Sequence, residues 1–200
     1  MRNSIFEGIL ANHCAPVLMG TKLSNLISVT KSGIASTDEL IASYNASYES
    51  YGISFMKLCE CEARALILVY NVERLKRYLC KKRVASVLRT YGYEDTSLDY
   101  CLDMLREKLM DFEFPHEIGI FLGFPLDDVL GFIENQGQNY VYCGYWKVYK
   151  NYEVSKRTFD LYDKLRAFVK KRLMEGEALE AIVRDVHQNT TGLHHLLNAA

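Results

Sequence analysis

Proline, glycine and net charge are all scarce in this sequence. The 200-residue chain contains three prolines and 12 glycines, and its formal net charge is −1. So few prolines and glycines exclude a collagen-like or linker-rich chain, and 49% hydrophobic residues with 24% charged residues exclude intrinsic disorder. The near-zero net charge removes the simplest argument for a nucleic-acid-binding protein, since positive charge is what attracts phosphate. A globular chain is therefore expected.

Long apolar runs are absent as well. The longest, such as residues 65–70, are far shorter than the roughly 18–20 residues that cross a bilayer. Glu7 stands where the apolar core of a signal peptide would begin, so we expect no export. Six cysteines are scattered over a chain too large to need disulfides, which is typical of a reducing compartment. These features predict a cytoplasmic protein without membrane contact.

Helical and strand patterns are interspersed along the chain. Helices are predicted at residues 4–11, 36–51, 73–80, 83–91, 95–111, 114–123, 125–134, 151–173 and 177–186. Strands are predicted at residues 25–29, 53–60, 64–70 and 140–149. The segment 64–70 is apolar on both faces, which predicts a central strand paired with 53–60 in a hairpin. We expect the α+β class, with a small, mostly antiparallel sheet of three or four strands packed with several helices. A single domain should span 1–186, followed by a flexible tail at 187–200.

Charged residues are segregated in the sequence. Residues 73–89 carry seven basic side chains and one acidic one, whereas 109–146 carry six acidic side chains and no lysine or arginine. Such segments can be solvated faces that attract each other, or the basic one can hold an anionic ligand or an acidic protein partner. Residues 117–123 and 128–133 have the rhythm of a helix-turn-helix. Because Asp127 and Asp128 stand at the start of its second helix, phosphate would be repelled and we expect no DNA binding.

Two short motifs contain reactive side chains. His13 and Cys14 precede a proline, and Lys22 follows nearby, so Cys14 could be a nucleophile with a lowered pKa. The alternative is a buried structural thiol beside a satisfied histidine. His116 and Glu117 stand at a helix start, where they could perform acid–base chemistry or bind a metal. Alternatively, they cap the helix and complement its dipole.

Cys59 and Cys61 lie two residues apart on the same face of a predicted strand. Two thiolates could bind a soft metal, but the sequence contains no second matching pair, and zinc usually takes four ligands. A structural or incidental role is favoured, so we assign no metal site.

Residues 140–149 form a dense aromatic cluster. They include four tyrosines and Trp146, with Gly144 and Lys147 among them. Such rings can stack on a flat ligand such as a flavin, a haem or a base. A glycine within the run leaves room for a ligand or a neighbouring chain. Alternatively, they form the core and rim of a sheet. We take the candidate ligand-binding residues to be Lys22, Gly144, Trp146, Lys147 and Tyr149.

Several motifs together resemble a known family. They are His13–Pro16, Leu18–Lys22, Phe114–Pro125, Asp128–Ile133 and Gly144–Tyr149. Over residues 9–173 the chain resembles the bacterial family DUF3793, whose domain has no assigned function. The resemblance implies a small cytosolic protein of anaerobic bacteria, with a link to iron, haem or flavin physiology. The family's recurrent positions fall on His13, Cys14, Pro16, Lys22, His116, Glu117, Gly119, Gly123, Gly144, Trp146, Lys147 and Tyr149. It implies no catalytic role for any of them.

Three functions remain open from the sequence. The leading hypothesis is a non-enzymatic module that binds a small molecule, a cofactor or a partner protein. The first alternative is an enzyme with Cys14 as nucleophile, His13 or His116 as base, and Lys22 holding an anion. The second is a metal or haem protein that uses His116, Cys14 or Cys143. The ligand, the cofactor and the oligomeric state are not identified by the sequence.

Overall fold

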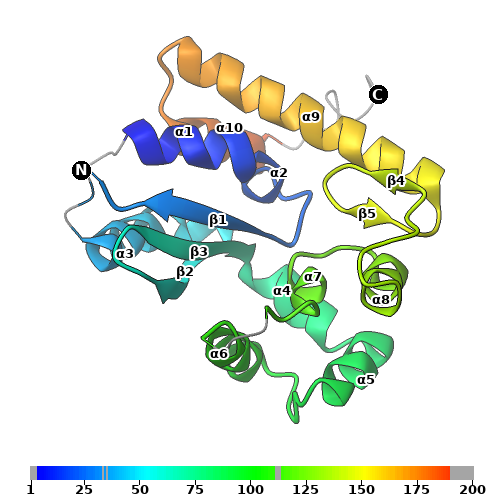
Figure 1. Cartoon of the computed structure of the whole chain (residues 1–200). Coiled ribbons are helices and arrows are strands. Elements are labelled where there is room, and N and C mark those ends of the chain that lie inside the picture. The colour runs from blue at the N-terminus through cyan, green and yellow to red at the C-terminus, as the bar shows by residue number, and fades with distance from the viewer. Residues whose placement is uncertain (1–3, 33, 35, 111–113, 190–200) are drawn as a thin grey trace.

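A three-stranded antiparallel sheet lies at the centre of the molecule (Figure 1). The computed structural model describes residues 4–32, 34, 36–110 and 114–189. The strands are β1 (Ser24–Thr30), β2 (Ile53–Glu60) and β3 (Arg64–Asn71), in the order β1-β3-β2. The predicted hairpin and the central position of its second strand are confirmed. This position follows from composition, since β3 buries apolar side chains on both faces.

Ten α-helices are present in the described residues, which confirms the α+β class. They are α1 (Ser4–His13), α2 (Ala15–Leu18), α3 (Thr37–Tyr48), α4 (Val72–Leu79), α5 (Lys82–Thr90), α6 (Leu98–Lys108), α7 (Ile118–Phe121), α8 (Leu126–Glu134), α9 (Tyr152–Met174) and α10 (Leu179–Gln188). A short 3-10 turn, Glu49–Tyr51, follows α3. No helix within these described ranges is at once long enough and apolar enough to span a membrane.

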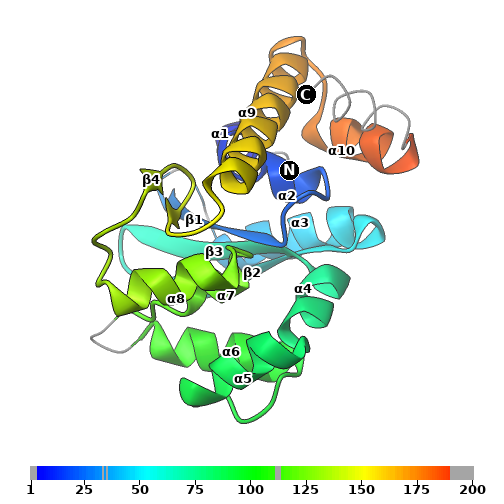
Figure 2. The same ribbon diagram turned by 90° about the vertical axis from the view of Figure 1, so that its right-hand side faces the viewer.

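Helices cover both faces of the sheet (Figure 2). One face packs against α1, α2, α3, α9 and α10, and β3 contributes Ala65, Ile67 and Val69 to that core. The opposite face packs against α4, α5, α6, α7 and α8, where β3 contributes Leu68 and Tyr70. This alternation follows from the two-residue period of a strand. Burying each large side chain stabilises the fold by roughly 1.5–3 kcal/mol. Because β3 contributes side chains to both cores, it joins them into one domain.

Some predicted boundaries change for local reasons. The helix predicted at 95–111 begins at Leu98, because the Asp95 carboxylate accepts hydrogen bonds from the backbone amides of Thr96 and Ser97 in a preceding turn. Residue 111 lies outside the described residues. At the other end of the chain, α10 continues to Gln188, and the His187 ring bonds the carbonyl oxygen of Leu18 at 2.9 Å. Residues 190–200 of the predicted tail are outside the described part.

The prediction of one continuous strand at 140–149 was wrong. This segment forms a small hairpin of β4 (Tyr142–Cys143) and β5 (Lys147–Val148), which pair antiparallel. The chain reverses at Gly144, whose amide donates to the carbonyl oxygen of Trp146 at 3.1 Å. The hairpin lies between α8 and the first turns of α9 (Figure 1). Side-chain packing at this turn overrides the alternation seen in the sequence.

The segregated charges meet in the fold. The basic segment forms α4 and α5, and the acidic segment includes α7 and α8. Arg83 of α5 forms an ion pair with Asp127 of α8. This contact fits the first of the two alternatives from the sequence, in which the two charged segments attract each other.

Candidate functional site

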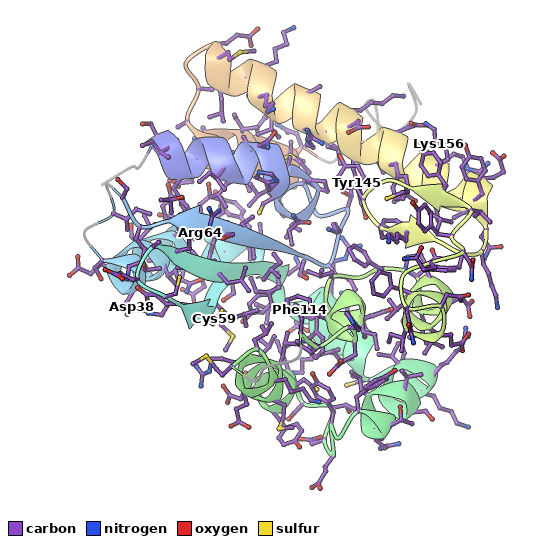
Figure 3. The ribbon with its side chains drawn as sticks, viewed as in Figure 1. Asp38, Cys59, Arg64, Phe114, Tyr145 and Lys156 are labelled. Carbon is purple, nitrogen blue, oxygen red and sulfur yellow. The ribbon has the colours of Figure 1, made fainter. Side chains whose placement is uncertain are left out.

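A cavity of about 380 Å³ opens between the α7–α8 pair and the β4–β5 hairpin. Its walls are mostly apolar and aromatic. The lining residues are Phe114, His116, Ile118, Gly119, Leu122, Phe124, Asp128, Val129, Phe132, Cys143, Gly144, Tyr145, Trp146 and Lys147. Figure 3 labels two of them, Phe114 beside α7 and Tyr145 beside the hairpin. A volume within the range of about 300–1,000 Å³ and a few polar groups on apolar walls are typical of small-molecule sites.

The Asp128 carboxylate ties the hairpin to α8. It is only 2% exposed. One oxygen accepts from the Trp146 indole Nε1 at 2.8 Å, and the other accepts from the amides of Tyr149 at 2.8 Å and Lys150 at 3.0 Å. Three donors satisfy this buried charge, as a charge inside a protein requires. Asp128 therefore fixes one wall of the cavity relative to another.

Trp146 is part of the cavity wall and is largely buried. It is 8% exposed, and it stacks on Phe124 with ring centroids 5.3 Å apart. The edge-to-face contact with Phe159 of α9 is closer, at 4.4 Å. The sequence predicted a ring on which a ligand stacks. In the structure, only the part of the indole that faces the cavity is available to a ligand.

His116 and Lys147 bring polar groups to the cavity. The Lys147 ammonium donates to the Gly137 carbonyl oxygen at 2.7 Å and lies over the rings of Tyr140 and Phe132. An ammonium has three donors, so Lys147 keeps hydrogen-bonding capacity beyond the Gly137 contact. His116 is exposed and contacts the Phe132 ring edge-on, with centroids 5.3 Å apart. The structure thus brings together two sequence motifs that were predicted separately.

Close packing explains the glycines of this region. A Cβ atom on Gly144 would lie 2.4 Å from Cε2 of Phe159, and one on Gly119 would lie 2.9 Å from Cγ2 of Val129. Tyr149, a predicted ligand contact, does not line the cavity. Its ring packs on Gly131, where an added Cβ would come within 2.6 Å of the tyrosine Cγ. Glycine here permits close approach between elements, and Gly119 and Gly144 also line the cavity.

Glu117 lies beside a second cavity of about 340 Å³, which shares Phe114 and His116 with the first. Its carboxylate is buried and pairs with the Lys108 ammonium at 3.3 Å. The Tyr93 hydroxyl donates to the same oxygen at 3.4 Å. Burial and the neighbouring Glu117 charge raise the pKa of Tyr93, so its phenol stays protonated and can donate. Glu117 therefore does more than complement a helix dipole: its carboxylate is a buried partner for the Lys108 ammonium and the Tyr93 hydroxyl.

Lys22 is a buried cation behind the cavity wall. It is 6% exposed, donates to Asn25 Oδ1, and lies 5.3 Å from the centroid of Phe124 and 5.9 Å from that of Tyr162. Burial lowers the pKa of Lys22 from 10.5 to about 8. The unfolded chain therefore binds this proton more tightly than the folded one, and stability rises as the pH increases from about 8 to 10.5. Lys22 contacts Phe124, which lines the cavity, but is not itself among the lining residues.

Cys14 and His13 lie away from the cavity. Cys14 is fully buried at the start of α2, and burial raises the pKa of its thiol to about 12. His13 is exposed overall. Partial desolvation of its ring, together with the positive charges of Arg166 and Lys170, lowers its pKa. Neither residue lines the cavity that His116 lines. A protonated, inaccessible thiol is poorly suited to nucleophilic attack.

In the described part of the chain, no three histidine, cysteine or acidic side chains are grouped so that they could hold an ion. Cys143 is exposed and lines the cavity together with His116.

The cavity and its supporting residues lie in a region that matches a family model. The model is described as "Protein of unknown function (DUF3793)" and matches residues 10–183. The chain belongs to this family. The match confirms the resemblance seen in the sequence, and it includes every cavity-lining residue of this DUF3793 protein. No curated protein and no solved structure shows significant similarity to the chain.

Sequence reasoning missed several wall residues of this DUF3793 protein. Phe124, Val129 and Phe132 line the cavity. In the sequence, Phe124 stands between two predicted helices, and the other two are ordinary apolar positions of the helix predicted at 125–134. Asp128 was not distinguished from Asp127 in the sequence, where both stand at the start of a predicted helix. A glycine-rich pair of helices next to an aromatic segment was the available indication that the two would pack together.

Proposed function

We propose that this DUF3793 protein is a binding module for a planar aromatic molecule that carries an anionic group. The observation that carries the proposal is the cavity in which aromatic walls adjoin His116 and Lys147. Apolar rings favour a flat ring system, because stacked and edge-to-face contacts add to the hydrophobic gain. The Lys147 ammonium and the His116 ring favour an anionic substituent.

Flavins and haem both have this chemistry. A flavin mononucleotide has a phosphate, and haem has two carboxylates. His116 and Cys143 are residue types that ligate haem iron in other proteins, and both line the cavity. This supports the link to iron, haem or flavin physiology that the family resemblance implies. We further propose a cytoplasmic location, which six free cysteines support.

The single tryptophan provides a direct assay, because Trp146 lines the cavity. We would titrate the full chain with three probes: anilinonaphthalene sulfonate, flavin mononucleotide and haemin. Binding in the cavity is expected to quench Trp146 saturably, with a dissociation constant in the micromolar range or below. Haemin coordinated by His116 or Cys143 would also shift its Soret absorption band.

Two kinds of variant test the location. Leu122→Phe places a larger side chain in the cavity and should weaken binding at least about tenfold, since overfilling a packed site costs about 1–3 kcal/mol. His116→Ala and Lys147→Met remove one polar contact each and should weaken the binding of anionic probes about three- to tenfold. Met174→Ala is the matched control, because Met174 is 83% exposed and does not line the cavity.

The proposal fails if none of the three probes quenches Trp146. It also fails if Leu122→Phe, once shown to be folded by circular dichroism, binds all probes as tightly as Met174→Ala. If Leu122→Phe weakens binding but His116→Ala and Lys147→Met do not, only the proposal that the ligand carries an anionic group is refuted.

A further inference from the structure

The β2–β3 hairpin places two cysteines on one face of the sheet, near its turn. A register shift after Lys57 sets Cys59 opposite Leu66, and the Cys61 amide donates to the Arg64 carbonyl oxygen at 2.9 Å. Leu66 and Arg64 are two residues apart on β3, so Cys59 and Cys61 face the same side. Figure 3 shows Cys59 near the end of β2, on the side of the sheet toward α6. Cys61 is exposed and Cys59 is half-buried.

The surroundings of the two thiols differ. Hydrogen bonding by the backbone of Ala63 and Arg64, together with the charge of Lys31, lowers the pKa of Cys61. Burial and the adjacent Cys61 raise the pKa of Cys59. The pair therefore consists of one thiol whose pKa lies below its ordinary value and one whose pKa lies above it.

The Lys31 ammonium is held beside the hairpin turn by several contacts. Its ammonium donates to the Cys61 carbonyl oxygen at 3.3 Å and pairs with Glu60 at 2.7 Å. Its backbone amide also donates to the Ala63 carbonyl oxygen at 2.9 Å. These contacts connect the end of β1 to the hairpin turn and hold positive charge next to the exposed thiol.

The spacing suits a disulfide that forms and breaks easily. Two residues of strand span about 6.8 Å between Cα atoms, at the upper limit for a disulfide. Cys59 and Glu60 are the last two residues of β2, so the end of this strand has to contract locally for the two sulfurs to meet. A strained and exposed disulfide is reduced more readily than a structural one, as an exchange site requires.

We propose that Cys59 and Cys61 form a dithiol site that exchanges with disulfides of small thiols. The Cys61 thiolate attacks one sulfur of the disulfide RSSR, whose S–S bond breaks and releases RS⁻. Cys59 loses its proton to water and attacks Cys61 Sγ, which releases the second RS⁻ and forms the Cys59–Cys61 bond. The small disulfide gains two electrons, the protein dithiol loses two, and the two RS⁻ ions take up the released protons. This activity is independent of the aromatic cavity.

Oxidised glutathione and the full reduced chain test the proposal, with products assigned by peptide mass mapping. The wild-type chain should form the Cys59–Cys61 disulfide and retain no glutathione at Cys61. Cys59→Ser should accumulate one glutathione on Cys61, because the second step is removed. Cys61→Ser should slow modification of Cys59 at least about tenfold, because the ionised thiol is the one that attacks.

The exposed Cys80 and Cys143 act as controls within the same molecule. Iodoacetamide should alkylate Cys61 of the wild-type chain faster than either control at neutral pH, and its half-maximal rate should come at lower pH. Lys31→Met should slow this alkylation about threefold. The proposal is overturned if Cys61 is alkylated no faster than Cys143, or if wild-type protein keeps glutathione on Cys61 as stably as Cys59→Ser does. The alkylation needs no cysteine variant, so it decides the matter even if a serine variant does not fold.

Discussion

Replacement of Asp128 by asparagine tests whether this carboxylate holds the cavity together. The amide keeps one oxygen, which can still accept from the amides of Tyr149 and Lys150. Its NH₂ group replaces the oxygen that accepts from Trp146 Nε1 at 2.8 Å, so two donors then face each other.

The magnitude follows from these contacts. Losing a hydrogen bond to a charged group costs about 1.5–3 kcal/mol, and the two remaining bonds weaken when the charge disappears. Relief of the buried charge offsets part of the loss. We expect Asp128→Asn to lower the free energy of unfolding by about 3 kcal/mol, which for a chain of this size lowers Tm by about 6–12 °C.

Urea unfolding followed by far-UV circular dichroism measures the effect, with Asp127→Asn as the matched control. Asp127 is the neighbouring residue and makes a surface ion pair with Arg83, so its loss should cost at most about 1 kcal/mol. A double-mutant cycle with Trp146→Phe should give a coupling of about 1–3 kcal/mol. The reasoning is refuted if the two asparagine variants are equally stable, or if the coupling is zero within error.

Two further predictions concern the packing and the buried cation around the cavity. Gly144→Ala should destabilise the chain by about 1–3 kcal/mol, because its Cβ meets Phe159 at 2.4 Å, whereas Gly8→Ala in α1 meets nothing within 4 Å and should stabilise it by about 0.5–1 kcal/mol; equal effects in thermal unfolding would contradict the packing argument. Lys22→Met should be more stable than wild type at pH 7, and this difference should shrink by about 2 kcal/mol between pH 7 and 9.5, because the wild-type lysine loses its proton above a pKa of about 8. A difference that stays constant over this pH range in urea titrations would show that Lys22 is not held as a buried cation.

Local patterns predicted the elements well where the decisive interactions are local. At the start of the helix predicted at 36–51, the Ser36 hydroxyl accepts from the Glu39 amide at 3.2 Å, and α3 follows directly. The run of apolar residues in β3 likewise needs no knowledge of distant residues, because a strand apolar on both faces must be covered on both.

The site could not be predicted in the same way, because contacts between distant segments create it. Gly144, where the strand breaks, packs so closely on Phe159, 15 residues later in the chain, that no side chain would fit between them. Asp127 and Asp128 are chemically identical neighbours at a helix start, yet one is a surface ion-pair partner and the other is a buried acceptor for the hairpin. Only the position of the β4–β5 hairpin distinguishes them.

The buried charges give a physical reason to regard the cavity as a site. Among the described residues, the charged side chains that are buried are Lys22, Glu117 and Asp128. Asp128 lines the main cavity, Glu117 lines the adjoining one, and Lys22 contacts the Phe124 wall. Burying a charge costs stability unless donors or counter-charges compensate it, as they do for Asp128 and Glu117. Burial lowers the pKa of Lys22, so keeping its charge there costs the fold stability.

This cost separates a functional cavity from a packing defect. If the cavity is only a defect, Lys22→Met should gain stability at pH 7 and bind the aromatic probes as wild type does. If Lys22 holds Phe124 in place for a ligand, the same variant should be more stable and yet bind more weakly. Opposite changes in stability and binding within this one variant would show that Lys22 serves the site, because residues kept for function at a stability cost are expected to show this trade-off.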